Sequence, residues 1–343
     1  MRQLLNTLFI TSEDIYAALE GENIVLKRDG KEAARYPLHA LQGIVCFSYL
    51  GASPALMGAC AEKNILLAFC RPNGRFLCRT AGATHGNVLL RRAQYRLADD
   101  PRESTRLAGG FVFGKIYNAR SSLERTRRDH ELRIDSEKFM QSSLQLKGIL
   151  ETVPSVWDPD TLRGLEGAAA TVYFNCLDDM ILGDKEAFFF HGRNRRPPLD
   201  RVNALLSFAY SLLSGECASA LEAVGLDAYV GFLHRDRPGR NSMAQDLIEE
   251  LRPCLADRFV LTLINNRMVS ARDFEVQESG AVYLCDDARR TVLRRWQERK
   301  KEVILHPFLK EKIPWGLIPY VQALLLSRYI RGDLDAYPPF LWK

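Results

Sequence analysis

The chain is organised around a stretch that reads Gly225-Leu-Asp-Ala-Tyr-Val-Gly-Phe-Leu-His234, then Arg235-Asp-Arg-Pro-Gly-Arg240, then Asn241-Ser-Met-Ala-Gln-Asp-Leu-Ile-Glu-Glu-Leu-Arg-Pro253. We interpret it as an apolar approach that ends at a histidine, followed by a basic turn and a short helix. Ser242 is expected to cap this helix, because a serine hydroxyl accepts hydrogen bonds from the free amides of a first turn. Pro253 is expected to limit the far end, since helical geometry is disfavoured in the residue before a proline.

Three carboxylates follow His234 on the predicted helix. Asp246 lies three residues before Glu249 and four before Glu250, so these side chains share one face. Imidazole and carboxylate ligands suit Mn²⁺ and similar ions, whereas Mg²⁺ prefers oxygen ligands and retains its waters. Surrounded by arginines, the pattern indicates a divalent cation that meets a phosphodiester. The alternative is a solvated acidic helix face behind a structural histidine.

Basic residues are concentrated in two blocks, although the formal net charge of the 343-residue chain is only +5. The block between positions 289 and 301 has a single acid and seven basic residues, which are Arg289, Arg290, Arg294, Arg295, Arg299, Lys300 and Lys301. The second block comprises Arg193, Arg195 and Arg196. Such local concentration is the electrostatic footprint of a polyanion partner. The alternative, for either block alone, is a solvated helix face.

Cysteine usage and apolar runs bear on the compartment. The eight cysteines include no C-x-x-C pair, which argues against a zinc knuckle or a small disulfide scaffold. The first ten residues lack the long apolar core of a secretory signal. The late apolar stretch 313–330 is interrupted by Pro314, Pro319 and Arg328 and does not suit a bilayer. We therefore expect a cytoplasmic protein with no membrane partner.

The order of the patterns predicts an α+β protein of two domains. Residues 1–85 are rich in strand signals, with a hairpin turn at Asp29-Gly30 and a short helix that opens at Ser53-Pro54. Residues 88–312 are dominated by helical periodicity. We predict a small N-terminal β-domain, either a sheet or a sandwich, and a larger all-helical C-terminal domain. A linker is expected at 83–87, and the tail at 313–343 is expected to dock on this chain or on a partner.

Two strong helices are expected in the second domain, at 162–182 and at 201–213, with Asp200 at the start of the second. The first contains Glu166, which is flanked by Gly167 and a run of small residues. A helical glycine costs roughly 1 kcal/mol relative to alanine, so this position indicates a close approach by another helix or by a nucleic-acid backbone. The alternative is a helix-packing seam with a partly exposed glutamate.

Four motifs in this order resemble those of a known family: Gly164-Leu-Glu166-Gly, Asn203-Ala-Leu-Leu-Ser-Phe, Gly231-Phe-Leu-His234 and Asp246-Leu-Ile-Glu249-Glu-Leu-Arg-Pro. Each is weak singly, but all four in order over nearly the whole chain are highly specific. The chain resembles the CRISPR-associated integrase, the nuclease-like protein common to spacer-acquisition systems. Two N-terminal segments, 37–54 and 86–95, look like the form found in type I-C systems.

The resemblance implies an N-terminal β-domain and a helical catalytic domain. It implies a metal site formed by Glu166, His234 and Glu249, with Asp246 as a supporting residue or alternative ligand. The expected cofactor is a single divalent metal ion, Mg²⁺ or Mn²⁺. The resemblance also implies a homodimer that assembles with a small ferredoxin-like CRISPR adaptation partner. The DNA that this protein is expected to bind is the spacer fragment and the CRISPR repeat.

The implied reaction is transesterification, in which the 3′-hydroxyl of a short DNA fragment attacks a phosphodiester at the edge of a CRISPR repeat. DNA phosphates are expected to meet the 193–196 block, four residues of the other block (Arg294, Arg295, Lys300 and Lys301), and four arginines around the central helix (Arg235, Arg237, Arg240 and Arg252). Two alternatives stay open. One is a non-catalytic DNA-binding scaffold with structural carboxylates, and the other is a general metal-dependent nuclease of branched or free DNA.

Overall fold

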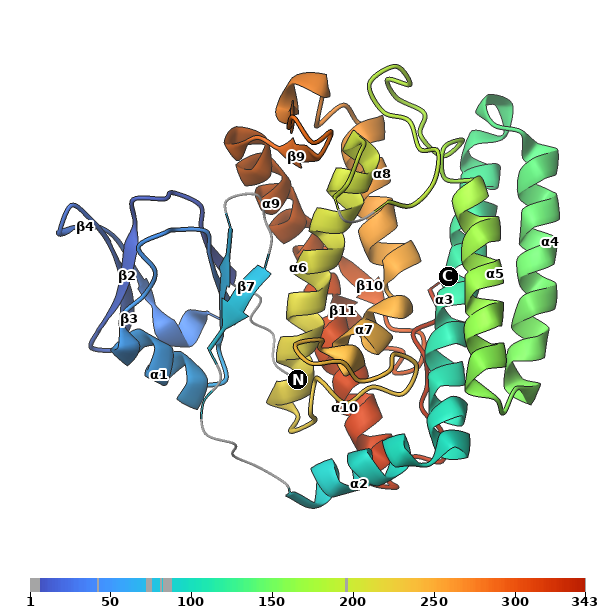
Figure 1. Cartoon of the computed structure of the whole chain (residues 1–343), viewed down its shortest axis with the longest axis horizontal. Coiled ribbons are helices and arrows are strands. Elements are labelled where there is room, and N and C mark those ends of the chain that lie inside the picture. The colour runs from blue at the N-terminus through green and yellow to red at the C-terminus, as the bar shows by residue number, and fades with distance from the viewer. Residues whose placement is uncertain are drawn as a thin grey trace. The chain divides into compact units, whose positions relative to one another are not determined.

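The computed structural model describes residues 7–41, 43–71, 76–80, 82, 88–194 and 197–342, so the predicted linker at 83–87 lies outside the described residues. The chain forms two compact units. The first combines residues up to 86 with 284–303 and 314–317, and the second spans 87–283, 304–313 and 318–343. The architecture is mixed α+β, with the longer strands first and the longer helices after them (Figure 1).

Two sheets lie in the first unit. A four-stranded sheet has the order β1-β5-β6-β7, with β1 (Thr7–Ile10), β5 (Gly43–Cys46), β6 (Leu66–Cys70) and β7 (Phe76–Arg79). Its first three strands are parallel and β7 is antiparallel. An antiparallel sheet contains β2 (Tyr16–Glu20), β3 (Asn23–Arg28) and β4 (Lys31–Pro37). Ile24, Ile44 and Leu56 belong to the buried core that the two sheets share with α1 (Pro54–Glu62).

Two local predictions for this unit are confirmed. Asp29 and Gly30 join β3 to β4 with φ values of 50° and 76°, and positive φ at both positions is what a two-residue type I′ hairpin turn requires. The predicted short helix is α1, and the Ser53 hydroxyl accepts a hydrogen bond from the Leu56 amide at 3.2 Å. Both features depend only on residues adjacent in sequence.

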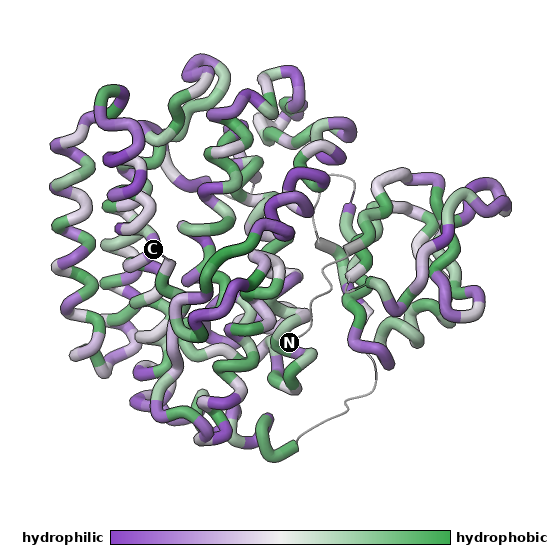
Figure 2. Tube along the Cα trace, turned by 180° about the vertical axis from the view of Figure 1, so that it is seen from behind, coloured by the Kyte–Doolittle hydropathy of each residue, from purple (hydrophilic) through white to green (hydrophobic). Residues whose placement is uncertain are grey.

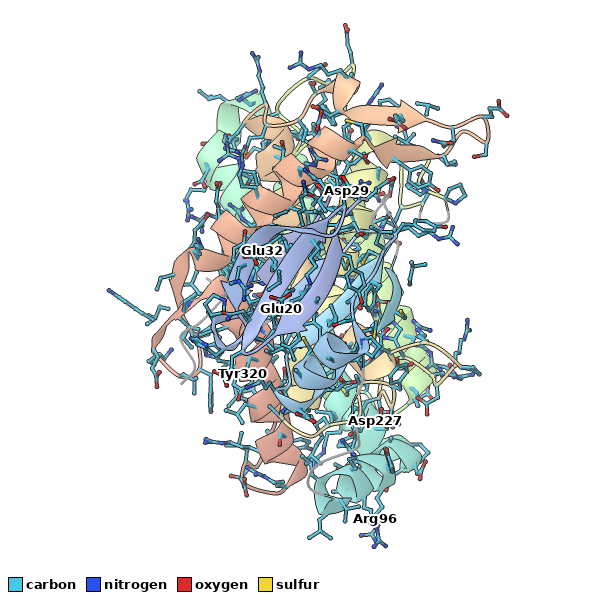
Figure 3. All side chains as sticks on the ribbon, turned by 90° about the vertical axis from the view of Figure 1, so that its left-hand side faces the viewer. Glu20, Asp29, Glu32, Arg96, Asp227 and Tyr320 are labelled. Atoms are coloured by element: carbon cyan, nitrogen blue, oxygen red, sulfur yellow. The ribbon has the colours of Figure 1, made fainter. Side chains whose placement is uncertain are left out.

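Charged side chains cover part of the three-stranded sheet. Arg35 lies 2.9 Å from a carboxylate oxygen of Glu20 and 2.7 Å from one of Glu32, and Figure 3 shows both carboxylates on this sheet. Arg35 and Glu32 belong to β4, which has one strand neighbour among the described residues. A charged edge strand of this kind discourages unwanted pairing with another chain.

The C-terminal part is not all-helical, so this part of the prediction is wrong. Two short pairs interrupt the helices: β8 (Phe274–Val276) with β9 (Val282–Leu284), and β10 (Val303–Leu305) with β11 (Lys312–Pro314). Strands of three residues are too short to give a recognisable alternation. In addition, α9 (Asp286–Lys301), which carries the larger basic block, groups with the N-terminal strands and not with the helical unit.

The second unit is built mainly from α2 (Val88–Asp99), α3 (Pro101–His130), α4 (Ser136–Thr152), α5 (Pro159–Asn175), α6 (Arg201–Ala223), α7 (Ser242–Glu249), α8 (Arg258–Asn265) and α10 (Ile318–Ile330). A π-helix at Arg252–Asp257 precedes α8. Short 3₁₀ helices lie at Glu131–Arg133, Val153–Ser155 and Ala271–Asp273 in this unit, and at Leu38–Ala40 and Trp315–Leu317 in the first. Figure 2 shows hydrophobic and hydrophilic residues alternating along the long helices, as expected of helices that bury one face.

Aspartates fix where the helices around the site begin. The carboxylate of Asp100 accepts from two first-turn amides of α3, at 2.9 and 3.1 Å. Asp158 accepts from the Thr161 amide of α5 at 2.7 Å, and Asp200 caps α6 in the same way, as predicted. Helix α5 ends at Asn175, earlier than the predicted end at 182. Just beyond this end, the Asp178 carboxylate accepts a hydrogen bond from the Phe190 amide of a later loop.

Helix α6 is long and apolar enough, by length and composition alone, to cross a membrane. More than half of that apolar window is buried inside the protein. Residues such as Leu205, Phe208 and Leu213 lie in the protein core, which is the ordinary location of such a helix in a globular protein.

Candidate active site

The three predicted site residues come from different elements and meet in the helical unit. Glu166 lies on α5, His234 in the loop before α7, and Glu249 at the last residue of α7. A fourth residue, Lys115 of α3, lies between the two carboxylates: its ammonium pairs with Glu166 Oε1 and lies 2.7 Å from Glu249 Oε2. His234 Nε2 lies 3.9 Å from Glu249 Oε1. Lys115 was not predicted.

Asp246 orients the histidine and the loop that carries it. Its two oxygens accept hydrogen bonds from the amides of Phe232, Leu233 and His234, at 2.6, 3.0 and 3.0 Å. Asp246 Oδ1 also lies 2.7 Å from His234 Nδ1. The other ring nitrogen, Nε2, is thereby turned toward Glu249. A carboxylate behind a histidine commonly fixes the tautomer and orientation of a metal-binding imidazole.

The loop packs tightly over α7 at Gly231. A Cβ atom at this position would lie 2.9 Å from the carbonyl oxygen of His234, 2.9 Å from Ser242 Cβ and 3.0 Å from Asp246 Oδ2. Two of these neighbours are a backbone atom and a buried carboxylate, so neither can move aside cheaply. Glycine at this position therefore allows the Asp246 hydrogen bonds to form.

Replacement of Gly231 by alanine is expected to lower catalytic turnover at least about tenfold, because a displacement of order 1 Å at a catalytic group costs that much or more. The measurement is the rate of DNA strand joining or cleavage at saturating metal. Gly215→Ala on α6, where an added Cβ meets nothing within 4 Å, is the matched control. Equal rates for the two variants would contradict the tight-packing argument.

The predicted cap of α7 is wrong. Ser242 is the first residue of the helix, and its hydroxyl donates to the Arg235 carbonyl oxygen at 3.2 Å instead of accepting from a helix amide. The basic turn folds back over the start of α7, so the hydroxyl ties the turn to the helix. The α-helix ends at Glu249, before Pro253 as expected, but the residue before the proline is not excluded from helical structure: Arg252 is the first residue of a π-helix.

Positive charge surrounds Glu249. Arg252 lies 2.9 Å from Glu249 Oε1 on the opposite side of the carboxylate from Lys115. Burial alone raises the pKa of Glu249, but the charges of Arg252 and Lys115 outweigh it and lower that pKa below its ordinary value. Glu249 is therefore an ionised carboxylate at neutral pH.

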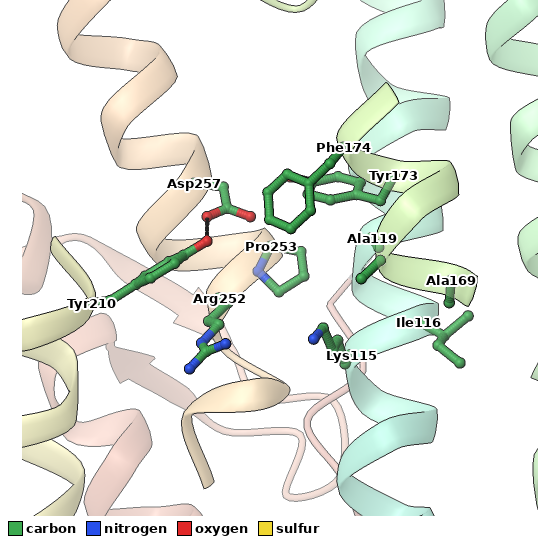
Figure 4. A pocket seen from close by; sticks show the side chains of 11 residues that line it. Lys115, Ile116, Ala119, Ala169, Tyr173, Phe174, Tyr210, Arg252, Pro253 and Asp257 are labelled. Carbon is green, nitrogen blue, oxygen red and sulfur yellow. Dashed lines mark hydrogen bonds between the residues drawn. The ribbon is translucent and has the colours of Figure 1, made fainter. Parts of the chain in front are cut away.

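A polar cluster continues from Arg252 away from Glu249. The Arg252 guanidinium stacks over the Tyr210 ring at 4.8 Å, and the Tyr210 hydroxyl donates to Asp257 at 2.5 Å (Figure 4). Burial raises the pKa of Asp257 to about 6 despite the hydrogen bond from Tyr210. A cavity of about 30 Å³ lies between this cluster and Lys115. Tyr210 thus supports the Arg252 guanidinium.

The donor set fits a divalent cation. Two carboxylates from separate helices, those of Glu166 and Glu249, approach one cation, the Lys115 ammonium, and His234 Nε2 lies 3.9 Å from Glu249. Glu249 Oε2 is buried, and the Lys115 ammonium lies 2.7 Å from it. In the conformation described, no three His, Cys, Asp or Glu side chains are close enough together to hold a metal among the described residues. Lys115 lies between two of the expected ligands.

The residues predicted to bind DNA lie in different environments. Arg195 and Arg196 lie outside the described residues. Arg193 and Arg252 are engaged internally: Arg193 lies 2.5 Å from Asn203 Oδ1, and both arginines stack on Tyr210. Arg235 and Arg237 are exposed in the turn after His234, and Arg240 is partly buried. On α9, Arg294 and Lys301 are exposed, Arg295 is partly exposed and Lys300 is buried.

The C-terminal tail docks on this chain beside Glu249. Glu250 turns away from the site and accepts hydrogen bonds from the Tyr337 hydroxyl at 2.6 Å and the Phe340 amide at 2.8 Å. Asn118 of α3 donates to the carbonyl oxygens of Glu250 and Phe340, at 2.6 and 2.7 Å. The tail thus ties the end of α7 to α3. The prediction left open whether the tail docks on this chain, and its contact with Glu250 was not predicted.

Protein stability is expected to fall as pH rises from about 5 to 8, in part because of Glu250. Burial raises the pKa of Glu250 to about 7 in spite of its hydrogen bonds from Tyr337, Phe340 and Gln322. An acid with a raised folded pKa stabilises the protein below its unfolded pKa, and this contribution is lost as pH rises through the folded value. The loss is about 3 kcal/mol.

The check is the free energy of unfolding in urea at several pH values for the wild type and Glu250→Gln. The glutamine amide stays neutral at every pH, so the free energy of unfolding of the variant should depend less steeply on pH. The part of the pH dependence that comes from Asp257, whose pKa burial also raises, should remain. Identical slopes in the two proteins would show that Glu250 is ionised in the folded state.

Fold and site together define an enzyme of the nuclease and integrase class, with carboxylates, an imidazole and basic side chains gathered in a helical unit that follows a β-rich segment. The family model "CRISPR associated protein Cas1" matches residues 8–298. The chain is 49% identical to the CRISPR-associated endonuclease Cas1 1 of Chlorobaculum tepidum and 48% identical to the CRISPR-associated endonuclease Cas1 2 of Rhodospirillum rubrum, with both chains fully covered in each case. The chain therefore belongs to the Cas1 family of CRISPR-associated endonucleases.

Solved structures agree on the fold. A casposase bound to integration product superposes with a TM-score of 0.83 at 22% identity, covering 99% of this chain and 95% of that one. A Cas1 protein from Thermotoga maritima gives a TM-score of 0.82 at 18% identity, covering 97% and 99%. At these identities the likeness is one of fold.

Proposed function

We propose that this protein is the integrase of CRISPR adaptation, which joins the 3′-hydroxyl of a short DNA fragment to the repeat by transesterification. The observation that carries the proposal is that Glu166 and Glu249 pair with one cation, the Lys115 ammonium, and that His234 Nε2 lies 3.9 Å from the Glu249 carboxylate. The family relationship supports an enzyme that acts on phosphodiesters, and it includes relatives named as endonucleases.

Glu166, Glu249 and His234 Nε2 are the groups that would hold a divalent ion, Mg²⁺ or Mn²⁺. Such an ion, when bound, polarises the phosphoryl oxygen and lowers the pKa of the attacking hydroxyl. Asp246 holds the imidazole so that its free nitrogen faces Glu249, and Arg252 holds the Glu249 carboxylate ionised and fixed in direction. The exposed Arg235 and Arg237 are placed to meet DNA phosphates beside His234.

We further propose that the protein works as a homodimer with a small ferredoxin-like partner, in the cytoplasm, and in the form found in type I-C systems. A solved structure similar in fold is a Cas6-RT-Cas1–Cas2 complex, with a TM-score of 0.82, and another is the casposase bound to integration product. These neighbours support the proposal that this protein binds DNA and assembles with a protein partner. The charge of α9 supports a further DNA contact through Arg294, Arg295 and Lys301.

The test supplies a repeat-containing duplex and two fragments, one with a free 3′-hydroxyl and one ending in a dideoxynucleotide, with Mn²⁺. An integrase joins only the first fragment, since the hydroxyl is the nucleophile. Equal strand breakage with either fragment, and no joined product, would make the protein a general nuclease. DNA binding without either product would make it a scaffold.

A further inference from the structure

Lys115 occupies the point at which the two expected metal-binding carboxylates meet. Its ammonium pairs with Glu166 and lies 2.7 Å from Glu249 Oε2, and the side chain is 12% exposed. The lysine comes from the middle of α3, a 30-residue helix capped by Asp100, so its backbone is held firmly. The two glutamates are 83 positions apart in sequence, and this one ammonium holds both.

A divalent ion bound by the same two carboxylates competes directly with this ammonium. Oxygen ligands lie about 2.0–2.6 Å from Mg²⁺ or Ca²⁺. An ammonium that stayed in contact with both carboxylates would therefore be an immediate neighbour of the ion. Like charges repel strongly at such separations, and more so where burial lowers the effective dielectric constant. The ammonium and the ion cannot both occupy this position.

The structure also provides space for the ammonium to leave. The cavity of about 30 Å³ that Lys115 helps to line extends toward Pro253, Tyr210 and Asp257 (Figure 4). A cavity of this size accommodates a water molecule, and an ammonium group is similar in size. Because lysine has a flexible four-carbon stem, we expect its ammonium to move toward this cavity by rotation of the side chain alone.

We propose that Lys115 is an internal cation that holds Glu166 and Glu249 together in the metal-free protein and is displaced when a divalent ion binds. The inference rests on the proposed function in that both use the same carboxylates. Its consequence is that Lys115 lowers the affinity of the site for metal, so the protein binds the divalent ion only at a higher concentration of that ion. In exchange, the lysine keeps the two carboxylates from repelling each other before loading.

The test is a titration with Mn²⁺, in which free ion is followed by its electron paramagnetic resonance signal, on the full chain without DNA. Lys115→Met, which keeps the length of the side chain and removes its charge, should bind Mn²⁺ at least about tenfold more tightly than the wild type. Lys115→Arg, which keeps the charge, should remain within about threefold of the wild type. Lys138→Met is the matched control, because Lys138 pairs with Asp179 on other elements.

Unchanged or weaker binding by Lys115→Met would overturn the inference, since the lysine would then be neutral or helpful toward metal. Thermal unfolding provides the second readout and also reports whether the variant folds. The metal-free Lys115→Met should unfold at a lower temperature than the wild type, because its carboxylates lack their cation. Added Mn²⁺ should raise its unfolding temperature by more than it raises that of the wild type. An equal or smaller rise would count against displacement.

Glu249→Gln separates failure of this inference from failure of the proposed function. If Glu249→Gln binds Mn²⁺ as well as the wild type, the carboxylates are not the metal site and both proposals fall. If Glu249→Gln weakens binding but Lys115→Met does not strengthen it, only the role of Lys115 falls. Weakening in the first variant together with tightening in the second supports both.

Discussion

Glu249→Gln should lose on the order of a thousandfold or more in strand-joining rate while retaining DNA binding. The residue lies at the centre of the site: its two oxygens face Arg252 and Lys115 at 2.9 and 2.7 Å, and His234 lies on the same side as Arg252. The amide has the same shape but carries no charge. Loss of one preorganised electrostatic contact at a reacting phosphate typically costs a hundred- to a thousandfold, and loss of a metal ligand adds to that.

The measurement is the single-turnover rate of joining a fragment with a free 3′-hydroxyl at saturating Mn²⁺, with DNA affinity determined in parallel. Glu186→Gln, an exposed position in the loop after α5, serves as the control. Glu166→Gln and His234→Ala should show large losses of the same kind. A rate within about threefold of the wild type in any of the three would remove that residue from the site.

Asp246→Ala should be the most destabilising single substitution in the site, with a loss of about 3 kcal/mol or more in the free energy of unfolding. The side chain is completely buried and accepts from three consecutive loop amides as well as lying against His234. Its removal leaves buried donors without acceptors, and each such group costs about 1–3 kcal/mol. Activity should fall as well, because the imidazole loses its orientation.

A comparison with His234→Ala isolates the structural part of this effect. That variant removes the imidazole but leaves the three amide bonds to Asp246 intact, so its stability should stay near that of the wild type. Chemical denaturation measures both, and hydrogen exchange at Phe232, Leu233 and His234 should accelerate only in Asp246→Ala. Equal stability losses in the two variants would mean that Asp246 acts solely through the histidine.

Local chemistry made part of this structure predictable from sequence. The Asp29-Gly30 hairpin turn, the helix that opens at Ser53-Pro54 and the Asp200 cap are decided by residues within a few positions of one another, and each formed as predicted. The cap at Ser242 failed for a related reason. The capping preference of serine considers only the helix itself. In this structure the preceding turn folds back over the helix, and the Ser242 hydroxyl donates to the Arg235 carbonyl oxygen instead.

Long-range contacts account for what the sequence did not reveal. Lys115 and Glu166 are 51 positions apart, and Asn118 and the tail residue Phe340 are 222 apart. No periodicity or spacing rule brings such pairs together. Glu166, His234 and Glu249 were assigned through the family motifs and not through geometry, which is why the residues between and behind them were missed. The short strands β8–β11 went undetected because three residues carry no pattern.

The central claim is that Glu166, His234 and Glu249 bind one divalent cation, and a crystal structure soaked with Mn²⁺ tests it most directly. Anomalous scattering from manganese should give one strong peak in the helical unit, within about 2.0–2.6 Å of both carboxylates and of His234 Nε2. A peak coordinated by other residues, or one that His234 Nε2 does not approach at full occupancy, would contradict the account.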